Sequence, residues 1–310
     1  MKRIFLFPGQ GSQTVGMGKD LAERFAHARQ RYQEAADVLS FDLAAVSFHG
    51  PEDELRQTRA TQPALYVHSC ILTDLLAERD IRPAAAAGHS LGEYSALYAA
   101  GAFTFADGLR LVKVRAEAMQ HAGQVNPGTM AAIVGLDDEA VARLCEEMSD
   151  REVVVPANYN SPGQLVVSGH VSAVRRAVEE AKVRGAKLAR ELPVSGAFHS
   201  PLMKPAAESL AAALKTTPLK TPQIPVISNV TGKPHTDVET LRKLLTDQLL
   251  SPVRWTESVL ELARMSNAQW LEVGSGNVLS GLLKRIVPGA SAVTIGSAAD
   301  LDKLTERANA

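Results

Sequence analysis

The pentapeptide Gly88-His89-Ser90-Leu91-Gly92 has the residue types of a nucleophilic serine on a sharp turn. It fits the pattern Gly-x-Ser-x-Gly, in which the serine lies between a strand and a helix. The apolar run 84–87 before it and the helical composition of 91–100 after it predict that arrangement. The backbone amide of Leu91, at the start of the helix, is then placed to stabilise an oxyanion. Because the pattern also arises by chance in Gly/Ser turns, the serine needs a chemical partner to be interpreted as a nucleophile.

His199 is the candidate general base among the eight histidines. It lies in GAFHSPLM (196–203), at the end of the central part of the chain, and a histidine at a domain junction can face a cleft. A polar residue at a helix N-terminus is an equally good interpretation of the residue type. An ordinary α/β-hydrolase has the order Ser, Asp, His, but no aspartate stands out between Ser90 and His199. This argues against a plain esterase.

Arg115 is the second chemical signal. On the predicted helix 105–122 it shares a face with Leu111, Ala118 and Met119 by helical spacing, so it points with the apolar side chains. A guanidinium on a buried face needs an anionic or hydrogen-bonding partner. Position alone favours a structural carboxylate as that partner. The other interpretation is a bidentate contact with a substrate carboxylate, which in an acyl-transfer site would select an acyl group that ends in a second carboxylate.

The elements that must position these residues predict an α/β fold with a mainly parallel sheet. Helices and strands alternate in the first and last parts of the chain, whereas the order in the middle is β-α-β-β-α-β, a ferredoxin-like pattern. We therefore expect a discontinuous large domain (1–127 and 195–310) interrupted by a small domain (128–194). The expected strands are 4–7, 84–87, 129–135, 153–157, 164–169, 187–194, 224–229 and 269–273. The expected helices are 17–25, 27–39, 62–77, 91–100, 105–122, 138–148, 171–184, 202–214, 237–250, 256–265 and 277–286.

Composition narrows the classes of partner. The 33 basic and 34 acidic residues nearly balance, which argues against nucleic-acid binding. Cys70 and Cys145 have no metal-binding or redox spacing, and we expect buried thiols in a reducing compartment. The apolar run 4–7 ends too early for a signal peptide, and no segment is long and apolar enough to span a membrane. A cytoplasmic protein without a metal site is expected.

Seven motifs in order resemble one enzyme family along essentially the whole chain. The family is the malonyl-CoA:acyl carrier protein transacylases of bacterial dissociated fatty acid synthesis. The motifs are FPGQGSQ (7–13), GHSLGEYSAL (88–97), VKVRAEAM (112–119), NYNSPGQLVVSG (158–169), GAFHSPLM (196–203), QLLSPVRWTESV (248–259) and EVGSGNVLSGLLKRI (272–286). The resemblance implies an α/β-hydrolase-like large domain interrupted by a ferredoxin-like small one. Two departures, Ser275 for a frequent proline and Tyr159 for a common phenylalanine, affect no catalytic role.

The resemblance also implies roles for individual residues. Ser90 would be acylated by malonyl-CoA, and His199 would be its base and later the acid for the leaving thiol. The backbone carbonyl of Gln248 would replace the third triad member, which accounts for the missing aspartate. Arg115 would bind the malonyl carboxylate. The backbone amides of Gln10 and Leu91 would form the oxyanion hole. Asn160, Gln164 and Phe198 would line the cleft.

The expected activity is malonyl transfer from malonyl-CoA to the phosphopantetheine thiol of an acyl carrier protein, by a ping-pong route through a Ser90 ester. No cofactor is expected besides the substrate, and a monomer is expected. Three alternatives remain open: a stand-alone acyltransferase of a polyketide synthase, a serine hydrolase, and a non-catalytic module that binds acyl carriers. Phe198, which precedes the histidine, resembles the residue at this place in malonyl-selective acyltransferases, which implies a preference for malonyl over branched extender units; the other interpretation is that Phe198 only packs at the domain junction. The basic residues expected to contact an acidic carrier are Lys182, Arg184, Lys187, Arg190, Lys284 and Arg285.

Overall fold

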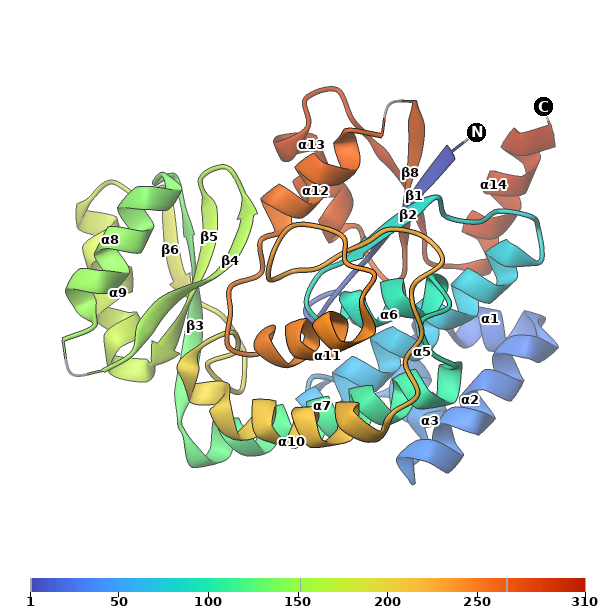
Figure 1. Ribbon diagram of the computed structural model, residues 1–310, viewed down its shortest axis with the longest axis horizontal. Coiled ribbons are helices and arrows are strands. Elements are labelled where there is room, and N and C mark those ends of the chain that lie inside the picture. Colours follow the sequence, from blue (N-terminus) through green and yellow to red (C-terminus); the bar gives the residue numbers. More distant parts are fainter. Residues whose placement is uncertain (1, 151, 266, 310) are drawn as a thin grey trace.

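Two separate β-sheets carry the architecture. The computed structural model describes residues 2–150, 152–265 and 267–309, so the outermost residues of the expected large domain lie outside it. Sheet A has the strand order β7-β2-β1-β8-β9, and sheet B has the order β4-β5-β3-β6. Figure 1 shows sheet B with two helices at one end of the molecule and sheet A toward the other. The mixed α/β class expected from the sequence is confirmed.

Sheet A is parallel and buried on both faces. Each neighbouring pair of its strands is parallel. Successive side chains of a strand point to opposite faces, and in β1 Ile4 and Leu6 pack in one hydrophobic cluster while Phe5 and Phe7 pack in another. This explains the uninterrupted apolar run in the sequence. The strands are β1 (Lys2–Phe7), β2 (Ala85–Gly88), β7 (Val226–Ile227), β8 (Ala268–Val273) and β9 (Ala292–Ile295).

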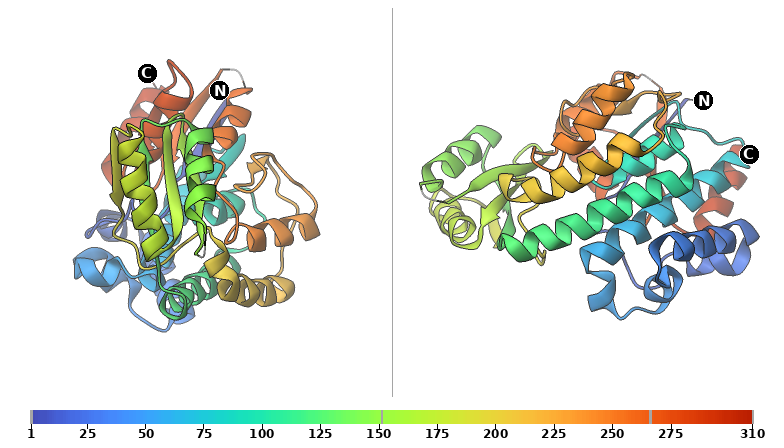
Figure 2. Two further views of the ribbon diagram at one scale, coloured as in Figure 1. Left: turned by 90° about the vertical axis from the view of Figure 1, so that its left-hand side faces the viewer. Right: turned by 60° about the horizontal axis from the view of Figure 1, so that its bottom comes forward.

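Helices cover both faces of sheet A. On the Ile4 and Leu6 face pack α12 (Trp255–Ala263) and α13 (Val278–Ile286). The cluster on the Phe5 and Phe7 face includes side chains from α1 (Lys19–Arg24), α2 (Ala26–Leu39), α3 (Leu43–His49), α4 (Glu52–Leu55), α5 (Thr58–Ala77), α6 (Gly92–Ala99), α7 (Phe105–Val125), α10 (Lys204–Thr216), α11 (Val238–Asp247) and α14 (Ala298–Asn309). The short 3₁₀ helix Pro201–Met203 precedes α10. The long helices α7 and α10 lie side by side (Figures 1 and 2).

Sheet B is antiparallel, and α8 and α9 pack on one of its faces. Its elements follow the expected order: β3 (Gly128–Val134), α8 (Asp138–Met148), β4 (Val154–Ser161), β5 (Gln164–His170), α9 (Val171–Val183) and β6 (Leu188–Glu191). Alternate residues such as Ala131, Ile133 and Leu165 pack against α8 and α9, which lie together on the outer side of the sheet (Figure 2, left). Met130 and Val166 point to the opposite face, which helps to line the cavity described below.

The edge of sheet B is joined to the chain segment that leads into α12. The backbone amide of Tyr159 donates to the carbonyl of Val253 (2.9 Å), and the amide of Val253 donates to the carbonyl of Ala157 (2.8 Å). Asn158 and Val253 thus form an isolated parallel bridge. The hydroxyl of Thr256 also donates to the carbonyl of Tyr159 (3.1 Å). These bonds satisfy backbone groups at the β4 edge and fix the small sheet relative to the large one.

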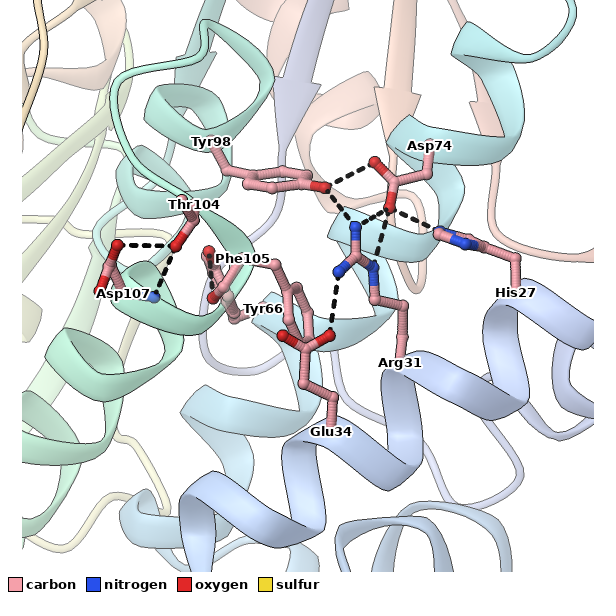
Figure 3. A network of polar contacts seen from close by, with 9 residues as sticks. All are labelled: His27, Arg31, Glu34, Tyr66, Asp74, Tyr98, Thr104, Phe105 and Asp107. Carbon is pink, nitrogen blue, oxygen red and sulfur yellow. Dashed lines mark hydrogen bonds and ion pairs between the residues drawn. The ribbon is translucent and has the colours of Figure 1, made fainter.

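A half-buried polar network joins α2, α5 and α6 on the Phe5 side of sheet A (Figure 3). The carboxylate of Asp74 accepts hydrogen bonds from Arg31 Nη2 (3.0 Å) and the Tyr98 hydroxyl (2.6 Å). His27 Nε2 lies 2.7 Å from the same carboxylate. The guanidinium of Arg31 also lies over the ring of Phe105, 4.5 Å from its centroid. The basic side chain of Arg31 is therefore paired directly with the acidic side chain of Asp74.

Several elements differ from the sequence prediction. The short helices α3 and α4 and the terminal pair β9 and α14 were not predicted. The strand expected over 224–229 contains only β7, because the chain turns at Ser228, whose amide bonds to the Lys233 carbonyl. The expected helices 17–25 and 277–286 begin one or two residues late, which is the usual uncertainty of helix ends. No helix in the described ranges has the length and apolarity needed to cross a membrane.

Candidate active site

Ser90 lies on a tight turn between β2 and α6 with a left-handed backbone conformation, φ 52°. Glycine is required on either side because the segments nearly touch. A Cβ atom at Gly88 would lie 1.8 Å from the carbonyl carbon of Gly92, and one at Gly92 would lie 2.1 Å from the carbonyl oxygen of Phe7. The turn therefore forms only with glycine at these positions, as the sequence pattern predicts.

Two distant side chains hold the strained turn. Asn229, just after β7, accepts from the Ser90 amide (2.7 Å) and donates to the Gly88 carbonyl (2.8 Å). Nε2 of Gln248, just after α11, donates to the Ser90 carbonyl (3.0 Å). A non-glycine residue with positive φ costs on the order of 1–3 kcal/mol and persists only where its surroundings determine it. These three hydrogen bonds hold the Ser90 backbone in its left-handed conformation.

His199 completes a nucleophile and base pair. Its Nε2 lies 2.8 Å from the Ser90 hydroxyl, and its Nδ1 lies 2.8 Å from the backbone carbonyl of Gln248. A carbonyl only accepts, so the proton of the neutral ring is on Nδ1 and Nε2 is left to accept the serine proton. His199 is 3% exposed and also has positive φ, 58°. Burial lowers the pKa of His199 to about 3, and the charge of Arg115 acts in the same direction, so the ring is neutral near pH 7 and its Nε2 carries no proton.

Arg115 is fully buried and bonded only to neutral acceptors among the described residues. Nη1 donates to Oε1 of Gln62 (2.7 Å), and Nη2 donates to the Ser90 hydroxyl (3.0 Å) and to Oε1 of Gln248 (2.9 Å). Its Nε has no hydrogen-bond partner in the described part of the chain. The guanidinium lies over the ring of Tyr94, 5.6 Å from its centroid. The structural carboxylate that position alone favoured is not in contact with it, so that interpretation was wrong.

The pair opens into a cavity between the two sheets. The loop after β1 and the turn after β2 form one wall, the face of sheet B opposite α8 and α9 forms another, and α13 closes a third side. The residues expected at the site, apart from the carbonyl of Gln248, line this cavity: Gln10, Ser90, Leu91, Arg115, Asn160, Gln164, Phe198 and His199. The apolar lining includes Met119, Met130, Val166, Leu192, Val194 and Leu282. The described lining therefore combines the fully buried guanidinium of Arg115 with apolar contacts from several elements.

Four features of the site were not predicted from the sequence: Gln62, Asn229, Glu93 and the side chain of Gln248. Each acts by contacts with residues far away in the chain, and an isolated Asn, Gln or Glu has no local pattern that reveals such contacts. The ring of His89 contacts sheet B, because its Nε2 lies 2.8 Å from Oδ1 of Asn160. The expected buried state of Cys70 and Cys145 is confirmed.

Comparisons with known proteins agree with this geometry. A family model described as acyl transferase domain matches residues 4–299. The malonyl CoA-acyl carrier protein transacylase of Escherichia coli K12 is 48% identical over 284 residues, which cover 91% of this chain and 92% of that protein. An acyl carrier protein S-malonyltransferase structure from Vibrio cholerae has a TM-score of 0.94 at 46% identity, covering 98% of this chain and 100% of that one. A malonyl-transacylase in complex with a type II PKS acyl-carrier protein has a TM-score of 0.95 at 44% identity, covering 99% and 100%. The chain belongs to the acyl transferase family.

Proposed function

We propose that the chain transfers a malonyl group from malonyl-CoA to the phosphopantetheine thiol of an acyl carrier protein, as an acyl-carrier-protein S-malonyltransferase of fatty acid synthesis. The observation that carries the proposal is the position of Ser90. Its hydroxyl lies between the Nε2 atom of His199 and the guanidinium of Arg115. A nucleophile that contacts both a base and a buried positive charge suits an acyl group with a distal carboxylate.

In the first half-reaction the Ser90 oxygen attacks the malonyl thioester carbonyl, and the serine proton moves to Nε2 of His199. The carbonyl oxygen becomes an oxyanion, which the amides of Gln10 and Leu91 stabilise; both residues line the cavity at the serine. The carbon–sulfur bond then breaks, and the CoA sulfur takes the proton from His199. The carbonyl of Gln248 keeps the ring oriented throughout.

In the second half-reaction the carrier thiol gives its proton to His199 and attacks the Ser90 ester. The ester oxygen leaves and recovers the proton, which restores the free hydroxyl. The same base serves both half-reactions because both thiols enter at the same place. No metal or cofactor takes part in this scheme.

Further assignments extend this proposal. We assign the β3–β6 part of the chain (128–194) to a ferredoxin-like domain and the rest to an α/β-hydrolase-like domain, supported by the parallel order of sheet A and the order β4-β5-β3-β6. Asn160 and Gln164 line the cleft from the small domain, and Phe198 limits the space beside the malonyl α-carbon. A cytoplasmic monomer remains our expectation.

A polyketide pathway is the second candidate. The observation that favours it is the likeness to a malonyl-transacylase solved with a type II PKS acyl-carrier protein. The chemistry at Ser90 is the same in both pathways, so the two differ only in the carrier that is accepted. Parallel transfer assays with a fatty acid synthase carrier and a polyketide carrier would separate them.

The covalent intermediate tests the proposal directly. We expect incubation with malonyl-CoA, in the absence of a carrier, to add one malonyl group to Ser90, as measured by intact mass and peptide mapping. Ser90→Ala should abolish the adduct and the transfer, because the Ser90 hydroxyl is the nucleophile in contact with Nε2 of His199. An adduct that persists in Ser90→Ala on a different residue would overturn the assignment.

Loss of the base should slow both half-reactions. We expect His199→Ala to lower the rates of acylation and of transfer to the carrier by on the order of a hundred- to ten-thousand-fold. Stopped-flow measurement of the two half-reactions, starting from free enzyme and from malonyl-enzyme, gives the two rates separately. Near-normal rates in both would place the base elsewhere.

Arg115 should determine which acyl group is accepted. Arg115→Ala leaves the malonyl carboxylate desolvated without a partner, and the loss of one member of a buried charge pair costs roughly 3–5 kcal/mol. Acetyl-CoA has no such carboxylate, so its acylation rate should stay level or rise. Lysine should rescue poorly because it cannot form the bidentate contact. Equal loss for both substrates together with a lower melting temperature would show that the arginine is structural.

The expected carrier-docking residues divide into two groups in the structure. Lys182 pairs with Glu179, and Arg184 pairs with Glu147 and Glu180, so their charge is already compensated. For Lys187, Arg190, Lys284 and Arg285 no acidic partner is found among the described residues, and all four are exposed. Arg190 precedes the cavity-lining Leu192 by two positions, and Lys284 follows the cavity-lining Leu282 by two. We propose that Lys187, Arg190, Lys284 and Arg285 contact the carrier.

Charge reversal should distinguish the two groups. Arg190→Glu combined with Lys284→Glu should raise KM for an acidic carrier and leave acylation by malonyl-CoA unchanged. Lys182→Glu is the matched control, because Lys182 is equally exposed but already paired. Steady-state kinetics at low and high salt would measure both effects. The docking proposal fails if the control raises KM as much as the double variant, or if salt has no effect on the carrier half-reaction.

A further inference from the structure

Glu93 is a buried carboxylate beneath the nucleophile that the reaction scheme does not use. It lies in the first turn of α6, three residues after Ser90, and is 2% exposed. Its Oε2 accepts from the backbone amide of Asn229 (3.1 Å) and from Nε2 of Gln248 (2.6 Å). Both donors belong to the two residues that hold the serine turn. Burying a carboxylate costs free energy unless it is compensated, so this position needs a physical explanation.

The amide of Gln248 connects Glu93 to Arg115. Its Nε2 donates to the carboxylate, and its Oε1 accepts from Nη2 of Arg115 (2.9 Å). An ionised carboxylate only accepts hydrogen bonds, and a guanidinium only donates them. The amide can therefore adopt one orientation only, with nitrogen toward Glu93 and oxygen toward Arg115. The Gln248 amide thus bridges the Glu93 carboxylate and the Arg115 guanidinium, which have no direct hydrogen bond to each other.

We propose that Glu93 is a positioning residue that sets both the orientation of the Arg115 guanidinium and its affinity for a substrate carboxylate, acting through the amide of Gln248. This inference rests on the proposed role of Arg115 as the malonyl-binding group. The negative charge of Glu93 competes with the substrate carboxylate for the same guanidinium. The competition limits the affinity for malonyl, so that the acyl group can leave with the carrier.

Protonation of Glu93 should relieve that competition. Burial raises the pKa of Glu93 to about 7, against the opposing effects of the Asn229 amide, the Gln248 amide and the Arg115 charge. The carboxyl group is therefore neutral at pH 6 and ionised at pH 8, and malonyl affinity should be higher at the lower pH. The other titratable groups around Glu93 do not change charge between pH 6 and pH 8. Arg115 on α7 stays positively charged. Burial lowers the pKa of His199 to about 3 and raises the pKa of Tyr94 on α6, so both side chains stay neutral. The segments at 228–229 and 248 present neutral groups to Glu93: the backbone amide of Asn229, the hydroxyl of Ser228 and the side-chain amide of Gln248.

The test compares malonyl-CoA with acetyl-CoA, which carries the same nucleotide and phosphates but no distal carboxylate. Acylation of Ser90 is measured at pH 6, 7 and 8 for the wild type and Glu93→Gln, and the readout is KM for malonyl-CoA divided by KM for acetyl-CoA. For the wild type we expect this ratio to rise with pH. For Glu93→Gln, which keeps the shape and removes the charge, we expect a ratio about three- to tenfold lower at pH 8 and nearly constant with pH.

Glu272→Gln is the matched control. Glu272 is also fully buried, but its carboxylate accepts from the amides of Leu279 and Ser280 at the start of α13 and has no contact with Gln248 or Arg115. The control should keep the wild-type KM ratio and its dependence on pH, whatever its effect on the melting temperature. If Glu93→Gln changes KM for both substrates equally, or if the pH dependence of the ratio persists in it, Glu93 has a structural role only and the proposal is wrong.

The double variant Glu93→Gln/Arg115→Ala separates this proposal from the function on which it rests. If Arg115→Ala does not lower the preference for malonyl-CoA, the proposed role of Arg115 fails. If Arg115→Ala lowers it but Glu93→Gln leaves the wild-type ratio unchanged, only the inference about Glu93 fails. If both hold, the effect of Glu93→Gln should disappear in the double variant, because the charge that it acts on is absent.

Discussion

A buried positive charge that contacts no anion among the residues described by the structure is the constraint on which this site is built. Arg115 is removed from water, and desolvation of an ion is expensive unless hydrogen bonds and opposite charge compensate it. The chain provides neutral acceptors from three separate segments: Gln62 on α5, Ser90 at the turn and Gln248 after α11. The half-buried Arg31 shows the structural alternative, because it binds the carboxylate of Asp74 directly. The incomplete compensation of Arg115 is thus a property of this cavity.

The backbone strain of Ser90 and His199 adds a second free-energy cost to that of burying Arg115. Ser90 and His199 both have positive φ, which few residues other than glycine tolerate. Each is held by contacts from other elements, and Gln248 contributes to both: its carbonyl orients His199, while its side chain binds the Ser90 carbonyl. Because one residue supports the nucleophile, the base and the arginine, displacement of the segment at 248 would disturb all three together. The two residues with positive φ are those to which we assign the reaction, and such strain is common at functional sites.

The residues predicted from the sequence are those whose roles depend on local geometry. Gly88, Ser90 and Gly92 form a turn within five residues, and helical spacing alone places Arg115 on the apolar face of α7. The supporting residues could not be found in this way, because the Asn229 contact with Ser90 spans 139 positions and the Gln248 contact with Arg115 spans 133. Similarly, the two-residue strand β7 is defined by its pairing with β2 and not by its own composition. Local patterns identified the reacting groups, and tertiary contacts determined what holds them.

The backbone bridge between β4 and Val253 has a consequence for how two large substrates use one cavity. The wall formed by sheet B is hydrogen-bonded to the segment that leads into α12, so rotating it outward would leave peptide groups unpaired. This wall of the cavity is therefore held in place while the two substrates alternate. Coenzyme A, the proposed donor, and the carrier protein, the proposed acceptor, differ greatly in bulk but both end in a phosphopantetheine thiol. A fixed wall suits the narrow arm that donor and acceptor share, so the two half-reactions need no outward movement of sheet B.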